Sequence, residues 1–355
     1  MAQTDGEQAG RQLKSRLAAR SMKRLGLIYV ATDALTIRRR RNGDGYTFIS
    51  ARGRTIKDEI ARARLKKLAV PPAYEDVLYA EDPRAHIQAI GRDAAGRLQY
   101  RYHADWEKVR EQKKARRLQR LVEVLPRVRR AINKHLAAAE PTREFALSAV
   151  IELVSCTAIR PGSESYAKQN GTRGAATLHK SNVAVNGTRV ALKFRAKGGK
   201  NIDKEFRCPR VARAISVLRE LPGRRMFQYR GADGTVRFVT ASDVNAFLRE
   251  IAGVKISLKD FRTLCASAAA LEALAHVEPA ASERGRRRQV KEAVTAVSEQ
   301  LSNTPTIARK SYVHQTVVAA FENGKLEKFS EGLKGRRSPA HREKLLAQVV
   351  ASMAA

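Results

Sequence analysis

The sequence has few cysteines, few aromatic residues and no long apolar run. Cysteine occupies 3 of its 355 positions. Because Cys156, Cys208 and Cys265 are far apart in the sequence and form no CxxC pair, we expect reduced core residues rather than a disulfide framework or a zinc site. No apolar stretch is as long as the about 18 residues that are needed to span a bilayer, and no signal-peptide h-region lies near the N-terminus. These absences predict a soluble, cytoplasmic protein without a membrane partner.

Negative charge is scarce relative to positive charge. The chain carries 69 Lys and Arg against 35 Asp and Glu, which gives a net charge of +34. Such an excess destabilises a folded domain through self-repulsion, so a polyanionic partner is the simplest explanation. Nucleic acid is the commonest polyanion that proteins bind, and we expect it to be the partner here.

Sequence motifs for ATP and metals are missing as well. There is no G-x-x-x-x-G-K-[ST] phosphate loop, no HExxH and no tight acidic cluster that would hold Mg²⁺. We therefore expect no cofactor and no metal. Any chemistry at a phosphodiester backbone should proceed without them.

The segment that follows the N-terminus has a β-rich pattern. Residues 1–23 are polar and basic without periodicity, which predicts a flexible basic arm. Within residues 24–104, Asn42–Gly45 is a strong hairpin signal, and a second β pair turns at about Asp93–Gly96. We expect residues 24–104 to form a small, mostly antiparallel β domain that binds nucleic acid.

Residues 105–140 are rich in helix formers and are expected to connect two domains. Leu118 and Leu125 lie on one face of the expected helix. Pro126 should interrupt this helix and Pro141 should stop it, because proline removes a backbone donor and clashes with the preceding turn. A domain junction is therefore expected within this segment, with a second helix starting at Pro141.

Residues 141–325 should form a mostly helical domain with a small sheet. Asn186–Gly187 and Gly198–Gly199 mark two successive hairpin turns, and hence three antiparallel strands. Beyond them, helical periodicity is found at 210–221, 241–251, 259–275 and 282–301. Residues 326–355 are a basic, helix-prone tail. The predicted fold class is α+β.

Four places offer charged or polar groups at the ends of predicted elements, where function is most often carried. Arg160 stands where a helix stops, and Lys197 lies in a hairpin turn. The simpler interpretation is that Arg160 faces a helix dipole and that Lys197 is solvated. Lys259 and Arg262 put two cations on one face near the start of a helix, which is unfavourable unless an anion binds there.

The fourth place is the stretch SNTPTIARKSYVHQ, in which Pro305 separates Asn303 from Tyr312. A tyrosine has a pKa of about 10, so about one in a thousand is ionised at neutral pH. Nearby cations and a bound phosphodiester can make the phenol a usable nucleophile. The alternative is an amphipathic tyrosine that packs on the last helix of the domain.

Together, these residues fit one reaction. Breaking a phosphodiester by transesterification needs a nucleophilic oxygen and an acid for the leaving oxygen. It also needs donors for the non-bridging oxygens, on which charge builds in the transition state. A tyrosine, a lysine, two arginines and a neutral donor fill these roles without a metal. The phosphotyrosine product keeps the bond energy, so resealing needs no ATP.

At these residues the sequence resembles a type IB DNA topoisomerase of the compact branch found in poxviruses and bacteria. The resemblance covers roughly residues 25–325. The stretches that carry it, in order, are HIQAIGRDAAGRLQYRYH, AIRPGSESYAKQNGTRGAATL, FRAKGGK, KDFRTL and SNTPTIARKSYVHQ. It implies a nucleoid-associated monomer that relaxes supercoiled double-stranded DNA. One strand would be nicked through a 3′-phosphotyrosyl link, allowed to rotate and resealed without ATP or metal.

The resemblance also implies a role for each candidate residue. Tyr312 would attack the phosphorus, while Arg160 and Arg262 would hold the non-bridging oxygens. Lys197 would protonate the departing 5′-oxygen, and Lys259 would help to relay the proton.

Asn303 is where this sequence departs from the poxvirus and nuclear enzymes, which carry histidine at the matching position. An amide can donate to a phosphate oxygen but cannot shuttle protons. Asn303 is therefore expected to steady the phosphate. His314, the nearest histidine, is expected not to be the acid.

The implied fold is a C-shaped clamp, with the β domain on one side of duplex DNA and the catalytic helical domain on the other. The expected DNA contacts are Arg92, Arg97, Gln99, Tyr100, Tyr102, Tyr166 and Lys168. For the two strand tyrosines the alternative is packing in the small core, because alternate strand positions face opposite sides.

Two other functions explain part of the pattern. Tyrosine recombinases and integrases share the catalytic fold, but their signature has histidine where this sequence has Lys259, and their N-terminal DNA-binding domain is usually all-helical. A non-enzymatic basic DNA-binding protein explains the positive charge. It does not explain the ordered set of candidate residues.

Overall fold

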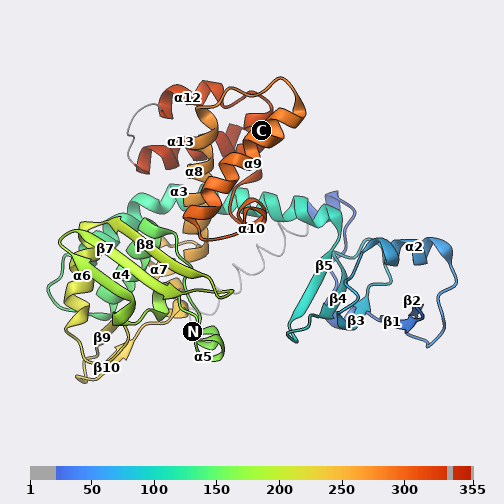
Figure 1. Cartoon of the computed structure of the whole chain (residues 1–355), viewed down its shortest axis with the longest axis horizontal. Coiled ribbons are helices and arrows are strands. Elements are labelled where there is room, and N and C mark those ends of the chain that lie inside the picture. Colours follow the sequence, from blue (N-terminus) through green and yellow to red (C-terminus); the bar gives the residue numbers. More distant parts are fainter. Residues whose placement is uncertain (1–20, 334–338, 353–355) are drawn as a thin grey trace. The chain divides into compact units, whose positions relative to one another are not determined.

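The structure, a computed structural model, describes residues 21–333 and 339–352 (Figure 1). The arm predicted over residues 1–23 lies almost wholly outside the described residues. The chain divides into two compact units, and the boundary falls between Lys113 and Lys114. No helix in the described part of the chain is long and apolar enough to cross a membrane.

The N-terminal unit is built on one antiparallel sheet with the strand order β2-β1-β3-β4-β5. Its strands are β1 (Ile37–Asn42), β2 (Gly45–Ile49), β3 (Glu75–Tyr79), β4 (Ile87–Arg92) and β5 (Leu98–Tyr102). Both predicted hairpins are confirmed: Asn42 pairs with Gly45, and Arg92 pairs with Leu98. Gly43, with a φ of 56°, supplies the left-handed conformation that the first tight turn requires.

One helix of the N-terminal unit was not predicted. Helix α2 (Glu59–Lys67) begins at Asp58, whose carboxylate accepts hydrogen bonds from the backbone amides of Ile60 and Ala61. Its Leu65 is buried with strand residues that include Ile37. The sequence signal was weak because Leu65 is the only buried residue of the helix, whose other side chains are mostly exposed and charged.

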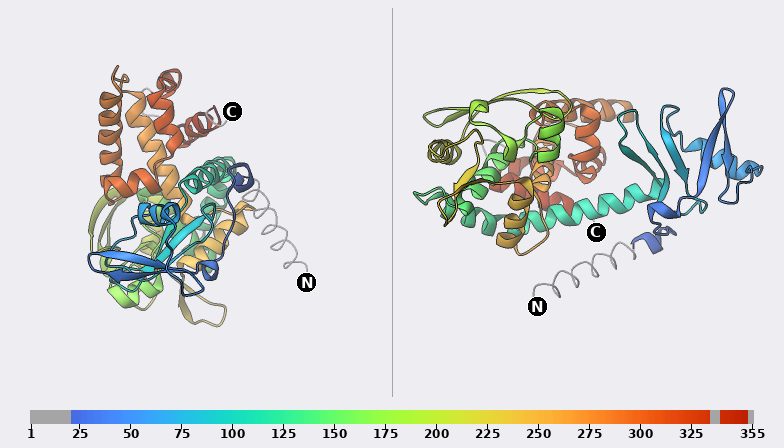
Figure 2. Two further views of the ribbon diagram at one scale, coloured as in Figure 1. Left: turned by 90° about the vertical axis from the view of Figure 1, so that its right-hand side faces the viewer. Right: turned by 90° about the horizontal axis from the view of Figure 1, so that it is seen from below.

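Helix α3 (Ala104–Leu136) continues through Pro126, so the predicted interruption at this proline is wrong (Figures 1 and 2). A proline inside a helix costs about 3 kcal/mol. The side chains on either side of Pro126 outweigh this cost because Leu121, Leu125 and Val128 are all buried in the core of the C-terminal unit. Tertiary packing holds the helix together where local propensity would break it.

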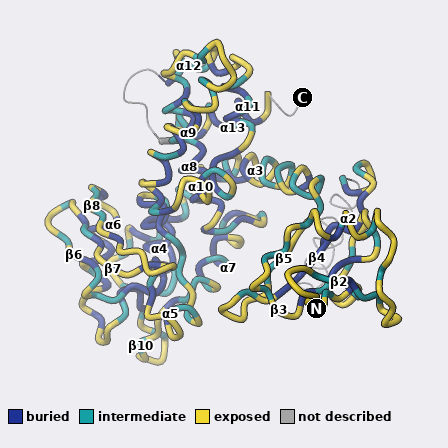
Figure 3. Tube along the Cα trace, turned by 45° about the vertical axis from the view of Figure 1, so that its right-hand side comes forward, coloured by how far each residue is buried: buried dark blue, intermediate teal, exposed yellow. Residues whose placement is uncertain are grey.

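The core of the C-terminal unit forms around α4 (Arg143–Thr157), which is buried along almost its whole length (Figure 3). The helix begins at Thr142, whose hydroxyl accepts a hydrogen bond from the Phe145 amide, and ends at Ala158 in the left-handed conformation. Three antiparallel strands follow, as predicted: β6 (Val183–Asn186), β7 (Arg189–Arg195) and β8 (Asn201–Arg207).

The four predicted helices of this unit are confirmed, with ends that differ from the prediction by two residues or fewer. They are α6 (Pro209–Arg219), α7 (Ala241–Ala252), α8 (Leu258–Ala275) and α9 (Glu283–Gln300). Short elements not predicted from the sequence are α5 (Glu164–Asn170), α10 (Pro305–Ser311), α11 (Gln315–Glu322), β9 (Gln228–Arg230) and β10 (Val236–Phe238). With the sheet at the N-terminus and helices dominating the rest, the fold class is α+β.

The segment predicted as a basic tail contributes two helices, α12 (Glu327–Leu333) and α13 (Pro339–Ser352). Leu346 and Val349 of α13 are fully buried in the core of the C-terminal unit. Glu343 of the same helix forms an ion pair with Arg129 of α3, at 2.8 Å. These contacts attach α13 to the folded unit.

The prediction that every cysteine lies in the core is wrong for Cys156, which is exposed, whereas Cys208 is buried and Cys265 is half-buried. All three are free thiols. Cys156 lies on the side of the last turn of α4 that faces solvent.

Candidate active site

Tyr312 lies at the end of α10, where the chain turns into α11. Its backbone amide donates to the carbonyl of Ala308, which closes the short helix, and its ring is only 9% exposed. Ser267 of α8 also holds the turn that follows Tyr312. The Ser267 hydroxyl donates to the Tyr312 carbonyl at 3.1 Å and accepts from the His314 amide at 3.0 Å. The tyrosine is therefore held by its backbone as well as by its ring.

Arg262 of α8 lies against the Tyr312 ring. Its guanidinium carbon is 4.7 Å from the ring centroid, and the side chain is 1% exposed. The guanidinium also donates to two helix-end carbonyls: that of Ala158, after α4, and that of Leu301, after α9. One buried cation thus joins the ends of two helices to the tyrosine.

The pKa of Tyr312 is lowered from its ordinary value. Burial of the phenol acts in the opposite direction and raises the pKa. The charge of Arg262 and a hydrogen bond from it, followed by the charges of Arg160 and Lys259, outweigh this effect. A larger fraction of the phenol is therefore ionised at a given pH than in an isolated tyrosine.

Arg160 and Asn303, 143 positions apart, are joined by a hydrogen bond from the guanidinium to the amide oxygen. Asn303 follows Ser302, whose φ of 51° turns the chain out of α9. Arg160 is fixed by its own carbonyl, which accepts from the Ala175 amide at 2.8 Å. This packing requires glycine at Gly174, because a Cβ there would lie 2.6 Å from the Arg160 carbonyl oxygen.

Two buried donors at this place have no partner in the described part of the chain. The Nε of Arg262 and the Nδ2 of Asn303 find no hydrogen-bond acceptor among the described residues. A buried donor without a partner costs roughly 1–3 kcal/mol. The oxygen of Asn303 accepts from Arg160, and its amide nitrogen remains available as a donor. Both donors are suited to an oxyanion that enters the site.

The two candidate lysines lie in different surroundings. Lys259 is the second residue of α8, and its charge acts on Tyr312. Lys197 is exposed in the turn between β7 and β8, with its ammonium 4.6 Å from the ring centroid of Tyr166 in α5. The structure thus groups Lys259 with Tyr312 and places Lys197 against Tyr166 in a separate contact.

Two residues that support the site could not be predicted from the sequence, because no motif or spacing marks them. Ser267 stands in an alanine-rich helix and is fully buried. Lys204 of β8 donates its ammonium to the carbonyl of Thr157 at 2.9 Å and to that of Gln300 at 2.5 Å. Burial, followed by the charge of Arg262, lowers the pKa of Lys204. Lys204 thus connects the C-terminal ends of α4 and α9. Arg160 and Asn303 follow these two helix ends in the sequence.

His314 is placed to cap a helix. Its Nδ1 accepts from the Thr316 amide at 3.2 Å at the start of α11, and its side chain is 2% exposed. That His314 is not the acid stays a prediction.

Two family models match the chain. Residues 103–337 match the model described as Eukaryotic DNA topoisomerase I, catalytic core, and residues 45–93 match Bacterial DNA topoisomerase IB, N-terminal domain. The chain belongs to the type IB DNA topoisomerase family. The topoisomerase assignment removes the recombinase and the non-enzymatic DNA-binding protein as explanations of the sequence.

Individual relatives agree with the family models. This topoisomerase is 29% identical to the DNA topoisomerase 1B of Acanthamoeba polyphaga mimivirus, over 73% of this chain and 80% of that protein. It is 26% identical to the DNA topoisomerase 1B of Vaccinia virus (strain Copenhagen), over 39% of this chain and 46% of the viral protein. The DNA topoisomerase I of Monkeypox virus matches over the same shares.

The predicted DNA contacts of the topoisomerase in its N-terminal unit lie on or beside β5. Tyr100 and Tyr102 are 41% and 36% exposed and stack on each other, with ring centroids 5.9 Å apart. The alternative that they pack in the core is therefore wrong, because the same-face positions of this edge strand face solvent. Arg97 and Gln99 both contact the Asp93 carboxylate, and Arg97 is the main cause that lowers the pKa of Asp93 to about 2.

The remaining predicted contacts are divided between the two units. In the N-terminal unit, Arg92 forms an ion pair with Asp76 at 3.4 Å and donates to the Gly96 carbonyl. In the C-terminal unit, Tyr166 is half-buried in α5. Lys168, two positions further on in the same helix, is exposed. All of these cations keep exposed surface that a phosphate backbone can reach.

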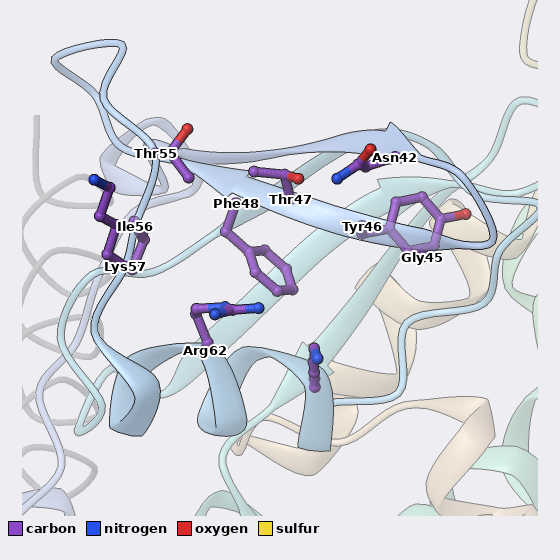
Figure 4. Close-up of a pocket in the computed structure, with 10 residues that line it drawn as sticks. Asn42, Gly45, Tyr46, Thr47, Phe48, Thr55, Ile56, Lys57 and Arg62 are labelled. Carbon is purple, nitrogen blue, oxygen red and sulfur yellow. The ribbon is translucent and has the colours of Figure 1, made fainter.

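The N-terminal unit also contains a cavity of about 580 Å³ between β2 and α2 (Figure 4). Phe48 points into it from the strand, and Arg62 extends toward it from the helix. Lys57 and Lys66 complete its positive lining. None of the predicted site residues lines this cavity, so it adds to the basic surface of the unit and not to the Tyr312 site.

Proposed function

We propose that Tyr312 is the nucleophile of this topoisomerase and that it cleaves one DNA strand through a 3′-phosphotyrosyl link. The phenolic oxygen attacks the phosphorus, the bond from phosphorus to the 5′-oxygen breaks, and the phenolic proton leaves to solvent. The observation that carries the proposal is the pair of buried donors beside the tyrosine, Arg262 Nε and Asn303 Nδ2, which have no acceptor among the described residues.

The non-bridging oxygens of the phosphate are assigned to Arg160, Arg262 and Asn303. Negative charge builds on these oxygens in the transition state, and fixed donors in a water-poor site stabilise it most effectively. The hydrogen bond between Arg160 and Asn303 supports this assignment because it fixes both groups before DNA binds. The buried Arg262 provides a positive charge that needs no reorganisation.

Protonation of the leaving 5′-oxygen is assigned to Lys197, with Lys259 assisting. Lys259 is already near enough to act on the Tyr312 charge. Lys197 lies in an exposed glycine-rich turn, in which Gly198 and Gly199 both have positive φ. Such a turn can adjust when DNA binds, so the lysine would reach the phosphate in the complex.

Resealing is the reverse of cleavage: the free 5′-hydroxyl attacks the phosphotyrosine and returns the phenol. We propose that a monomer relaxes supercoiled DNA in this way without ATP or a metal ion. The side-chain cations provide the charge stabilisation that a metal would otherwise give. Both units would contact duplex DNA, through the predicted contacts at β5 and α5.

The test is relaxation of supercoiled plasmid in EDTA and without ATP, with wild type beside Tyr312→Phe. The phenylalanine keeps the ring against Arg262 and removes only the hydroxyl. We expect complete loss of relaxation, unchanged DNA affinity, and loss of the protein adduct on 5′-labelled DNA trapped in detergent. Tyr229→Phe, a partly buried tyrosine in the same unit, is the control and should relax DNA normally. Equal activity of wild type and Tyr312→Phe would contradict the proposal.

A further inference from the structure

Cys156 and Cys208 lie side by side although they are 52 positions apart. Their sulfur atoms are 3.1 Å apart, and the Cys156 thiol donates to the sulfur of Cys208. Cys156 is exposed on the last turn of α4, whereas Cys208 is 6% exposed at the N-cap of α6. A small solvent-borne reagent can therefore reach a thiol pair that the fold holds in contact.

The surroundings of the pair favour a thiolate at Cys208. The hydrogen bond from Cys156 is the largest effect and lowers the pKa of Cys208, and the Val211 amide at the start of α6 acts in the same direction. Burial opposes them, and the resulting pKa is about 7. The same hydrogen bond raises the pKa of Cys156. The proton of the pair therefore stays on Cys156, and the Cys208 thiolate is the nucleophilic sulfur.

The geometry fits a sulfur–sulfur bond better than a metal site. Glu152 is the third potential ligand, but its Oε1 accepts two hydrogen bonds from Arg210, at 2.8 and 2.5 Å. Two thiolates on one zinc ion, with zinc–sulfur bonds of about 2.3 Å, lie about 3.8 Å apart. The observed 3.1 Å is shorter, and closing it to a disulfide needs a movement of about 1 Å.

We propose that Cys156 and Cys208 form a redox-sensitive pair that hydrogen peroxide converts to a disulfide. The Cys208 thiolate attacks the peroxide, so a sulfur–oxygen bond forms, the oxygen–oxygen bond breaks and hydroxide leaves. The Cys156 thiol then attacks the sulfenic sulfur, the sulfur–sulfur bond forms and water leaves. Each sulfur is oxidised by one electron, and both peroxide oxygens are reduced. A dithiol reductant reverses the bond by exchange.

The disulfide would act on the Tyr312 site through Arg160, and this step rests on the proposed function. Cys156 belongs to the last turn of α4, four positions before Arg160. The carbonyls between them, at Thr157 and Ala158, are held by Lys204 and Arg262. A pull of about 1 Å on this turn therefore displaces Arg160, and a displacement of that size can slow catalysis by up to about 10²-fold.

The experiment treats the full-length reduced enzyme with hydrogen peroxide and maps its disulfides by mass spectrometry without reduction. We expect a peptide pair that links Cys156 to Cys208, while Cys265 stays an unoxidised thiol that is alkylated after unfolding, because burial raises its pKa to about 11 and keeps it protonated. Cys265→Ser should give the same link and Cys156→Ser none. Failure to form the link overturns the redox pair, as does a bound metal that blocks it.

Relaxation rates measured on the same samples test the link to Arg160. Oxidised wild type should relax plasmid more slowly, by up to about 10²-fold, and a dithiol should restore the rate. Cys156→Ser should keep its full rate in peroxide. A linked enzyme with an unchanged rate overturns the coupling, and so does equal slowing of Cys156→Ser. If reduced wild type does not relax DNA at all, the proposed function fails, and disulfide mapping still decides the redox pair.

Discussion

The guanidinium carbon of Arg262 lies 4.7 Å from the centroid of the Tyr312 ring, although the two residues are 50 positions apart in the sequence. Arg262 is the largest fully buried side chain in the described part of the protein. A buried cation without a carboxylate partner is costly. Its contacts here are helix-end carbonyls and the phenol, which leaves its charge available to an incoming phosphate.

Arg262→Lys should reduce the cleavage rate by a factor on the order of 10²–10³ because the planar, forked donor is lost. The pKa of Tyr312 should also rise toward its ordinary value, because the hydrogen bond from the guanidinium that helps to lower it is lost. A lowered pKa means more phenolate at a given pH, so the rise of rate with pH should move to higher pH in the variant. Single-turnover cleavage across a pH series measures both effects.

The matched control for this substitution is Arg213→Lys. Arg213 also donates to helix-end carbonyls, those of Leu136 and Ala138, but it has no assigned part in the reaction. It should leave the pH profile unchanged. If both variants shift the profile equally, the effect belongs to altered folding and not to Tyr312.

Substitutions of Asn303 test whether its amide donates to the phosphate or only accepts from Arg160. Asn303→Asp keeps the oxygen that Arg160 contacts but loses the amide donor and adds a charge that repels phosphate. Asn303→Ala loses both groups without adding charge. We expect both to slow cleavage, by about 10²–10³ for the aspartate variant, and less for alanine. Faster cleavage by Asp than by Ala in the same assay would contradict a phosphate-facing amide.

Lys197 is tested by changing the leaving group. Lys197→Ala should slow cleavage of ordinary DNA by about 10²–10⁴-fold, the range for loss of a general acid. With sulfur in place of the bridging 5′-oxygen, the leaving group needs no proton, and the variant should approach the wild-type rate. Lys200→Ala, in the same exposed turn, is the control. Persistent slowing of Lys197→Ala on the sulfur substrate would remove its acid role.

The positive charge makes salt dependence a test of the DNA contacts. For a phosphate-contacting lysine such as Lys168, replacement by glutamine should reduce the log–log salt slope by about 0.9. Tyr100→Leu should weaken binding without changing the slope, because an uncharged ring releases no counterion. Fluorescence anisotropy over a salt series measures both. A slope that does not change in Lys168→Gln would show that this residue does not contact phosphate.

Local patterns were enough to predict most of the secondary structure. Hairpin turns at Asn42–Gly45 and Gly198–Gly199 and the apolar stripe of α9 depend on neighbours within a few positions, and the structure confirms them. The predicted interruption at Pro126 is wrong because helix α3 depends on contacts that are not local. The helix is held by buried side chains that contact segments far along the chain, which no local pattern contains.

By itself, the sequence determined which chemical groups are available: a tyrosine, two arginines, two lysines and an amide at the ends of predicted elements, on a strongly basic chain. Only the tertiary structure decided how they are grouped. The burial of Arg262 against Tyr312, the bond between Arg160 and Asn303, and the contact of Cys156 with Cys208 all join segments 50 or more positions apart. Spacing along the chain cannot specify such contacts, because they form only when the helices pack around one core.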